Sequence, residues 1–150
     1  MRIRPESLAL FALVLLGPGL AVAQVTIDTP WARATAAKAM AGGAFMTITS
    51  VGADRVTKIE SPVAANVELH QTVEEAGVMK MKPVPALVLI AGKSVTLKPG
   101  GYHVMLMGLK APLKQGEHFP ITVFFANSPP VTVEVQIAAP GAAGPAMHTH

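Results

Sequence analysis

The sequence contains no cysteine. A disulfide framework, a thiolate zinc finger, a CxxC redox motif and an iron–sulfur cluster are therefore excluded, because each of them needs a thiol. The same absence excludes a blue-copper electron-transfer site, whose metal is bound by a cysteine thiolate. The fold must depend on a hydrophobic core, which a chain of 150 residues is long enough to form.

Charged residues are also scarce. Only 14% of the residues are Asp, Glu, Lys or Arg, and the formal net charge is +3. This balance favours neither nucleic-acid binding nor electrostatic attachment to a membrane. By contrast, the chain contains eight methionines and five histidines. Their thioether and imidazole groups are therefore the first candidates for function.

The first 23 residues have the pattern of a secretory signal peptide. Arg2 and Arg4 precede an apolar segment at 8–16 that is too short to span a bilayer, and Ala-Val-Ala at 21–23 is a typical cleavage sequence. Cleavage would lower the formal net charge from +3 to +2 and leave Gln24 as the mature N-terminus. An uncleaved membrane anchor is the alternative interpretation.

No cysteine follows the apolar segment, which excludes a bacterial lipid anchor there, and no later segment is long and apolar enough to span a membrane. We therefore expect a periplasmic protein without stable membrane insertion once the signal peptide is removed.

Residues 24–137 are expected to form one all-β domain. Short segments rich in Val, Ile, Thr and Phe alternate with Gly, Pro, Asn and Asp, and this spacing predicts an antiparallel Greek-key β-sandwich of the immunoglobulin-like kind. Ala34–Ala41 is expected to be a loop or a single turn, and Asn127–Pro130 a hairpin connection. The expected strands are Val25–Asp28, Ala44–Ser50, Arg55–Glu60, Asn66–Gln71, Val78–Pro83, Ser94–Leu97, Tyr102–Met107, Ile121–Phe125 and Val131–Ile137.

The tail, residues 138–150, changes in composition. Ala138 to Ala146 are all Ala, Gly or Pro, too poor in large apolar groups to offset the entropy of ordering, and this predicts a flexible segment. The sequence ends in Met147-His148-Thr149-His150.

Three of the expected strands carry donor groups at alternate positions, which places the donors on one face of each strand. The apolar residues between them are expected to face the core: Val67, Leu69, Val104 and Leu106. The residues on the outward faces are Glu68 and His70, Met79 and Met81, and His103, Met105 and Met107. We therefore expect two imidazoles and several thioethers to meet at one end of the sandwich.

The softness of these donors indicates which metal they bind. Thioether sulfur and neutral imidazole favour Cu(I), whereas Zn(II) prefers His with carboxylate or cysteine, and Ca(II) and Mg(II) prefer oxygen. Cu(I) accepts low coordination numbers, so a surface site of this kind can exchange its metal with a partner.

The spacing of four donors resembles the signature of the periplasmic PCuAC-type copper chaperones. His70 is followed after ten residues by Met81, and after a further twenty-one residues by His103-x-Met105. The likeness extends from about Val25 to Ile137. The flanking segments that share it are Trp31–Thr35, Gly43–Met46, Val67–His70 and Gly101–Leu109.

The resemblance implies a cupredoxin-like β-sandwich that binds one Cu(I) through four ligands: His70, Met81, His103 and Met105. It also implies copper delivery toward the Cu(A) centre of cytochrome c oxidase. The implied partners are the oxidase subunit that carries Cu(A) and a Sco-type thioredoxin-like chaperone. Met79 and Met107 lie outside the signature, as neighbours or core residues. Met40, near the Gly turn, is an accessory candidate, and Met46 is expected to pack in the core.

The C-terminal His148-x-His150, with Met147, resembles the His- and Met-rich extensions of some family members and implies a second copper site. Two imidazoles and a terminal carboxylate suit Cu(II), which is harder than Cu(I). The tail would then capture Cu(II) or help to close the main site. A solvated end with adventitious metal affinity is the alternative.

Two other classes of function compete with a copper chaperone. A copper oxygenase of the polysaccharide monooxygenase type binds copper through an N-terminal histidine, whereas the expected N-terminus is Gln24. A serine hydrolase lacks support because no serine lies in a GxSxG context. We therefore expect no catalysis. An exported sandwich module for adhesion or assembly, with incidental Met and His, remains the alternative and predicts no stoichiometric copper.

Overall fold

The computed structural model describes residues 24–146, which form ten β-strands and no helix. None of these residues therefore forms a helix long and apolar enough to cross a membrane. The all-β fold expected from the sequence is confirmed. The strands are β1 (Val25–Arg33), β2 (Ala41–Ser50), β3 (Asp54–Glu60), β4 (Ala64–Glu75), β5 (Val78–Pro83), β6 (Leu87–Leu89), β7 (Ser94–Thr96), β8 (Tyr102–Leu109), β9 (His118–Phe125) and β10 (Val131–Ala138).

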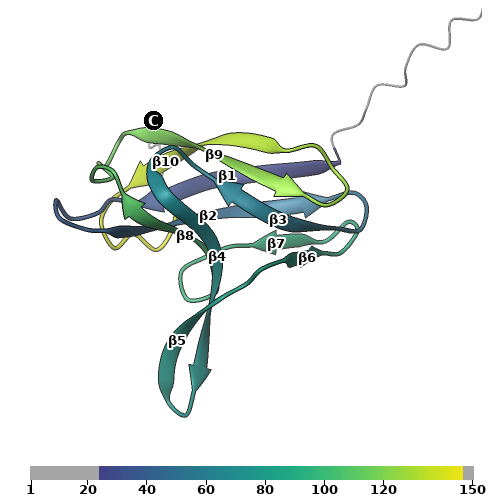
Figure 1. Cartoon of the computed structure of the whole chain (residues 1–150), viewed down its shortest axis with the longest axis horizontal. Coiled ribbons are helices and arrows are strands. Elements are labelled where there is room, and N and C mark those ends of the chain that lie inside the picture. Colours follow the sequence, from purple (N-terminus) through teal and green to yellow (C-terminus); the bar gives the residue numbers. More distant parts are fainter. Residues whose placement is uncertain (1–23, 147–150) are drawn as a thin grey trace, which may run out of the picture.

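The strands follow one continuous hydrogen-bonded path that folds over on itself (Figure 1). The order along the path is β5-β4-β8-β2-β1-β10-β9-β3-β6, and β7 pairs with β2. Residues from both halves of the path, β8 and β9 among them, share one buried core. The chain therefore forms the expected sandwich.

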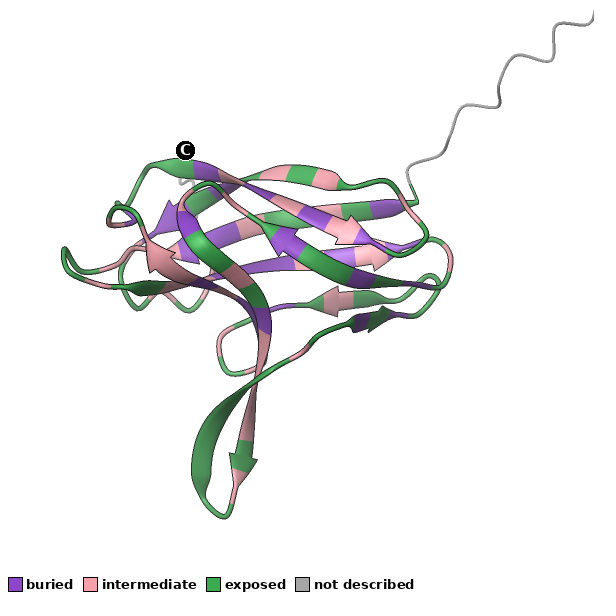
Figure 2. Ribbon diagram, viewed as in Figure 1, coloured by how far each residue is buried: buried purple, intermediate pink, exposed green. Residues whose placement is uncertain are grey.

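The core is built by alternation along the strands (Figure 2). Val104 and Leu106 in β8 and Ile121 and Val123 in β9 are completely buried. Burying a side chain of this size contributes about 1.5–3 kcal/mol. The expectation that the apolar residues of β8 face the core is confirmed, and Leu69 in β4 is buried as well.

β1 differs from the sequence prediction, because it continues past Asp28 to Arg33. Pro30 has no N–H to donate to a ladder. The strand accommodates it with a bulge, where the φ angle of Thr29 is 48° and the register with β2 shifts. Beyond the bulge, β1 also pairs with β10 in parallel, with Trp31 opposite Gln136. The expectation of a purely antiparallel sandwich is wrong at this one pair.

The other differences are small. β6, which pairs with β3, is not among the strands expected from the sequence. Its exposed middle residue, Val88, is apolar like the buried Leu87 and Leu89, so the sequence shows no alternation there. The remaining strands differ from their expected limits by a few residues at most, and β5 matches them. The loop after β1 is confirmed, as is the hairpin connection between β9 and β10.

The chain after β10 lies against the sandwich as far as it is described. Ala138, expected to begin the tail, is the buried last residue of β10. Arg33 Nε donates a hydrogen bond of 2.7 Å to the carbonyl of Ala142, which packs against a cluster containing Trp31 and Phe45. The two aromatic rings have centroids 4.5 Å apart. Flexibility of the tail stays a prediction.

Two sequence predictions lie outside the described residues. The signal peptide at 1–23 is one of them, and the terminal Met147, His148 and His150 are the other.

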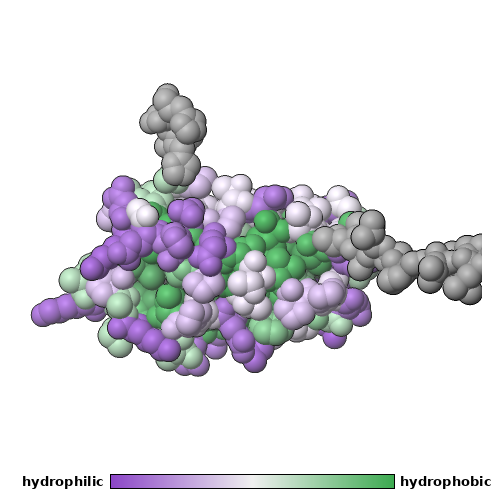
Figure 3. All heavy atoms as spheres, turned by 90° about the horizontal axis from the view of Figure 1, so that it is seen from above, coloured by the Kyte–Doolittle hydropathy of each residue, from purple (hydrophilic) through white to green (hydrophobic). Residues whose placement is uncertain are grey.

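The sandwich does not cover all of its apolar residues. Figure 3 shows apolar side chains between polar ones on the face seen from above. Within residues 24–146, the large hydrophobic side chains that are more than half exposed are Met40, Val51, Val78, Met79, Met81, Val88 and Ile90. Three of these seven are methionines, which ordinarily fill gaps in cores.

Asp54, at the start of β3, is a buried carboxylate that fixes the loop after β9. It accepts hydrogen bonds from the Ser128 hydroxyl and from the backbone N–H groups of Arg55 and Asn127, the last two at 2.8 and 2.9 Å. Burial acts to raise the pKa of Asp54, but these hydrogen bonds outweigh it and hold the pKa below its ordinary value.

We predict that Asp54→Ala lowers the free energy of unfolding at pH 7 by about 1–3 kcal/mol, because three donors lose their acceptor. Since the folded pKa is lowered, the ionised carboxylate stabilises the fold above the unfolded pKa of about 3.9. This contribution is lost as the pH falls through the folded pKa, so wild type and variant converge at acid pH. Denaturant unfolding followed by Trp31 fluorescence measures both effects.

Glu60→Ala is the matched control on the same strand. Glu60 is exposed and pairs with Lys58 at the surface, at 2.6 Å, an interaction expected to contribute below about 1 kcal/mol. Equal losses of stability in the two variants would contradict the role assigned to Asp54.

Candidate metal centre

His70 and His103 face each other across neighbouring strands. The antiparallel register of β4 and β8 places them directly opposite each other, with ring centroids 6.0 Å apart and ring planes inclined at 62°. His103 is 5% exposed, and the side chain of His70 is 13% exposed. The structure thus brings the two imidazoles together, although it covers them more than an open surface site would.

Each imidazole has one nitrogen in a hydrogen bond and one without a partner. Nδ1 of His103 donates to the carbonyl of Gly101 at 3.1 Å, and Nε2 of His70 donates to a carboxylate oxygen of Glu68 at 3.0 Å. Nε2 of His103 and Nδ1 of His70 are buried and have no hydrogen-bond partner. A buried polar atom without a partner costs free energy, so two of them on facing residues indicate a ligand.

Met105 lies two residues after His103 and therefore shares its face of β8. It stands between Glu68 of β4 and Gly43 of β2 in the strand register. Because Gly43 has no side chain, space remains beside Met105. That space is part of a hollow of about 250 Å³, lined by Arg33, Ala41, Gly42, Gly43, Phe45, Thr72, Met81, Pro99, Gly100, His103 and Met105.

Met81 reaches the hollow from a separate arm. β4 and β5 form a hairpin that projects from the body of the sandwich (Figure 1). Its two-residue turn is Ala76-Gly77, with φ angles of 51° and 79°, as a tight primed turn requires. Every residue of β5 is exposed (Figure 2), and Met81 is 58% exposed. A methionine accessible from solvent therefore lines the same hollow as the covered imidazole of His103.

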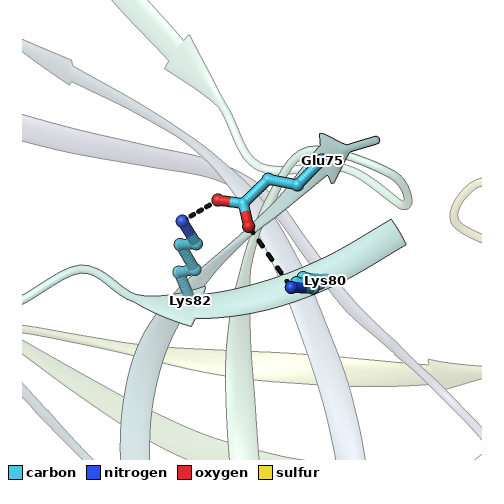
Figure 4. Close-up of polar contacts among 3 residues, drawn as sticks. All are labelled: Glu75, Lys80 and Lys82. Carbon is cyan, nitrogen blue, oxygen red and sulfur yellow. Dashed lines mark hydrogen bonds and ion pairs between the residues drawn. The ribbon is translucent and has the colours of Figure 1, made fainter. Parts of the chain in front are cut away.

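Charged residues occupy the other face of the arm. The carboxylate of Glu75 lies between the ammonium groups of Lys80 and Lys82 and pairs with both (Figure 4). These residues are about half exposed, so each pair contributes little to stability, at most about 1 kcal/mol. The arm is held mainly by its backbone pairing, and the methionine face carries no charge pair of its own.

The other candidates do not line the hollow. Met79 is exposed, two residues nearer the tip of the arm than Met81. Met107 lies further along β8. The backbone carbonyl of Met40 accepts a hydrogen bond from the N–H of Leu109. Leu109 is six residues from His103, which is about 20 Å along a strand at ~3.4 Å per residue. Met46, 1% exposed, is a core residue.

Nitrogen and oxygen donors do not gather elsewhere: across residues 24–146 no group of three or more His, Cys, Asp or Glu side chains could hold a metal ion. His118, the remaining histidine of this range, pairs with Glu134 at 2.9 Å. The residues with donor groups that line the hollow are therefore His103, Met81 and Met105, and the imidazole of His70 faces that of His103.

Several residues in or near the site carry little or no signal in the sequence. Glu68 was expected on the same face as His70, but its hydrogen bond depends on side-chain conformation. Arg33 and Phe45 lie in distant strands, and their interaction, 5.8 Å from the guanidinium carbon to the ring centroid, appears only in the fold. Glycine at position 43, opposite Met105, was the one available signal, because a glycine within a strand often marks space for a ligand.

Comparison with known proteins places the whole sandwich in one family. Residues 25–137 match the family model described as "Putative lipoprotein LpqE-like". A protein named as a lipoprotein in Leifsonia xyli subsp. xyli is 34% identical over 122 residues, which cover 79% of this chain and 74% of that protein. An uncharacterized protein of Rickettsia prowazekii is 35% identical over 124 residues, covering 79% and 68%.

Solved structures agree with this assignment. The copper-bound PCuAC domain from PmoF2 is 25% identical, with a TM-score of 0.67 over 80% of this chain and 97% of that domain. The Cu(I)-bound solution structure of DR1885 from Deinococcus radiodurans is 30% identical, with a TM-score of 0.63 over 80% and 81%. The cupredoxin-like fold expected from the sequence is thereby confirmed. The chain belongs to the LpqE-like family, and its fold is that of the PCuAC copper-binding domains.

Proposed function

We propose that this protein is a periplasmic copper chaperone that binds one Cu(I) through His70, Met81, His103 and Met105. One observation carries the proposal. Two facing imidazoles each have a buried nitrogen without a partner, and the thioethers of Met81 and Met105 line the hollow that His103 also lines. Two nitrogen and two sulfur donors form the soft set that Cu(I) prefers.

Transfer of the metal follows from the unequal exposure of the donors. The imidazoles are held on the sandwich, whereas Met81 lies on the exposed arm. We expect an acceptor to displace the Met81 thioether first and then to replace the remaining ligands one at a time. Because Cu(I) accepts low coordination numbers, the metal can move along a gradient of affinity without a catalytic acid, base or nucleophile.

The destination of the copper is the most specific part of the proposal. The resemblance supports delivery toward the Cu(A) centre of cytochrome c oxidase, to the oxidase subunit that carries it or through a Sco-type chaperone. Export to the periplasm is supported by the signal-peptide pattern at 1–23 and by the lipoprotein names of the family model and of the Leifsonia relative. Neither nucleic acid nor catalysis has a place in this role.

We predict that Met105→Leu and Met81→Leu each weaken Cu(I) binding by more than about 100-fold. Losing only a residue that is hydrogen-bonded to a metal ligand lowers metal affinity by about 10- to 100-fold, and these substitutions remove a ligand itself. Leucine keeps the volume and apolar character of methionine but has no sulfur donor. Competition with a Cu(I) chelator under reducing conditions measures the affinity, and X-ray absorption reports the sulfur-to-nitrogen ratio at the metal.

Met79→Leu is the matched control, because Met79 lies on the same face of β5, is 61% exposed and does not line the hollow. It should bind Cu(I) like the wild type. A wild-type protein without stoichiometric copper, or equal losses at positions 79 and 81, would contradict the proposal. The first of these results would favour the adhesion or assembly module instead.

Gly43→Val tests the hollow without removing a donor. The backbone of Gly43 has an ordinary strand conformation, and a Cβ there would lie 3.5 Å from the Phe45 ring, in normal contact. We therefore expect a folded variant whose isopropyl group obstructs Met105 and lowers Cu(I) affinity by about tenfold or more, a change of about 1.4 kcal/mol. Unchanged affinity with an unchanged melting temperature would show that copper does not use this space.

We also propose that the tail holds a second copper as Cu(II), through His148 and His150 with Met147. A truncation that tests this site must keep Ala138 and Ala142, because both residues pack in the cluster with Trp31 and Phe45 and their removal would disturb the sandwich. A chain ending at Ala146 should lose one Cu(II) equivalent and keep the Cu(I) site. Equal Cu(II) stoichiometry and affinity in the truncated and full-length chains would remove this second site.

A further inference from the structure

The imidazoles of the copper site have unlike hydrogen-bond partners. His70 is bonded through Nε2 to the carboxylate of Glu68, whereas His103 is bonded through Nδ1 to the backbone carbonyl of Gly101. A carbonyl and an ionised carboxylate can only accept, so the proton lies on Nε2 of His70 and on Nδ1 of His103. The neutral rings are therefore opposite tautomers.

The nitrogens left without protons are the two buried atoms without a partner, Nδ1 of His70 and Nε2 of His103. Histidines that bind metals commonly donate their other N–H to a carboxylate or a backbone carbonyl, which fixes the ring and its tautomer. Both kinds of support are present in this structure. Each ring thus presents one specific lone pair.

We infer that Glu68 is a positioning residue of the site, and that it makes His70 bind Cu(I) through Nδ1 while His103 binds through Nε2. This inference rests on the proposed function. Glu68 also stands opposite Met105 in the register, so the same carboxylate lies beside two ligand-bearing positions.

The unlike nitrogens have a geometric consequence. Nδ1 is nearer to its own backbone than Nε2, so a metal bound in this way lies closer to β4 than to β8. β4 continues into the hairpin that carries Met81. Binding through Nδ1 of His70 therefore places copper on the β4 side of the site, next to the arm that carries Met81. Glu68 determines this by accepting a hydrogen bond from Nε2, which leaves Nδ1 free to bind the metal.

Two substitutions separate the hydrogen bond from the charge. Glu68→Gln removes the charge but keeps an oxygen that can accept from Nε2 of His70, whereas Glu68→Val removes both and suits a strand. We expect Glu68→Gln to bind Cu(I) nearly as tightly as the wild type. Glu68→Val should weaken binding by about 10- to 100-fold, the range seen when such a partner is lost.

Long-range ¹H–¹⁵N NMR of the full chain gives a readout that a general loss of stability would not change. In the metal-free wild type and in Glu68→Gln, Nδ1 of His70 and Nε2 of His103 should be unprotonated, and these two signals should shift when Cu(I) is added. In Glu68→Val, the His70 ring should exchange between tautomers.

Three results would overturn the inference: a shift at Nε2 of His70 instead of Nδ1, tautomer exchange at His70 in the metal-free wild type, or equal affinities for the Gln and Val variants. Should the Val variant fail to fold, the wild-type and Gln spectra decide alone. A wild type that binds no Cu(I) would contradict the proposed function itself, whereas Cu(I) bound through the other nitrogen of His70 would contradict only the role of Glu68.

Discussion

The site depends on the backbone register between β4 and β8. That register places His70 opposite His103 and Glu68 opposite Met105. Because side chains alternate between the two faces of a strand, a shift of one residue would pair His70 with an apolar core position. The buried Leu69, Val104 and Leu106 resist such a shift, since it would move apolar side chains into water. The same packing that stabilises the sandwich thus aligns its donors.

Several features of the site favour binding over stability. Two buried imidazole nitrogens lack partners, and the exposed thioether of Met81 is an apolar group left in water. Each of these is unfavourable in the metal-free protein. Gly43 leaves a hollow where a larger residue could have packed. The proposed Cu(I), bound by both nitrogens and by the thioether sulfurs, would give these costs a common explanation.

The outer face of the sheet joins the site to the end of the described chain. Arg33 and Phe45 line the hollow, and they also contact the segment after β10, through the hydrogen bond to Ala142 and the aromatic cluster. The described chain up to Ala146 therefore contacts residues that also line the hollow.

Local sequence patterns determined much of this protein. Alternation predicted most of the strands, the inward-facing residues of β8 and the shared face of His103 and Met105, because these depend on a repeat of two residues. The missing cysteines excluded thiolate sites, and the spacing of four donors indicated copper. Patterns failed where the chain is irregular, as at the bulge around Pro30, and where an exposed residue is apolar, as at Val88 in β6.

Only the tertiary structure decided which donors meet and how. Four features depend on strand register or on side-chain conformation: the distance between the imidazoles, the hollow beside Gly43, the parallel pairing of β1 with β10 and the hydrogen bond from His70 to Glu68. Strand periodicity specifies the face of a side chain but not its neighbour. The neighbour is chosen by the packing of the whole core, which no single segment contains.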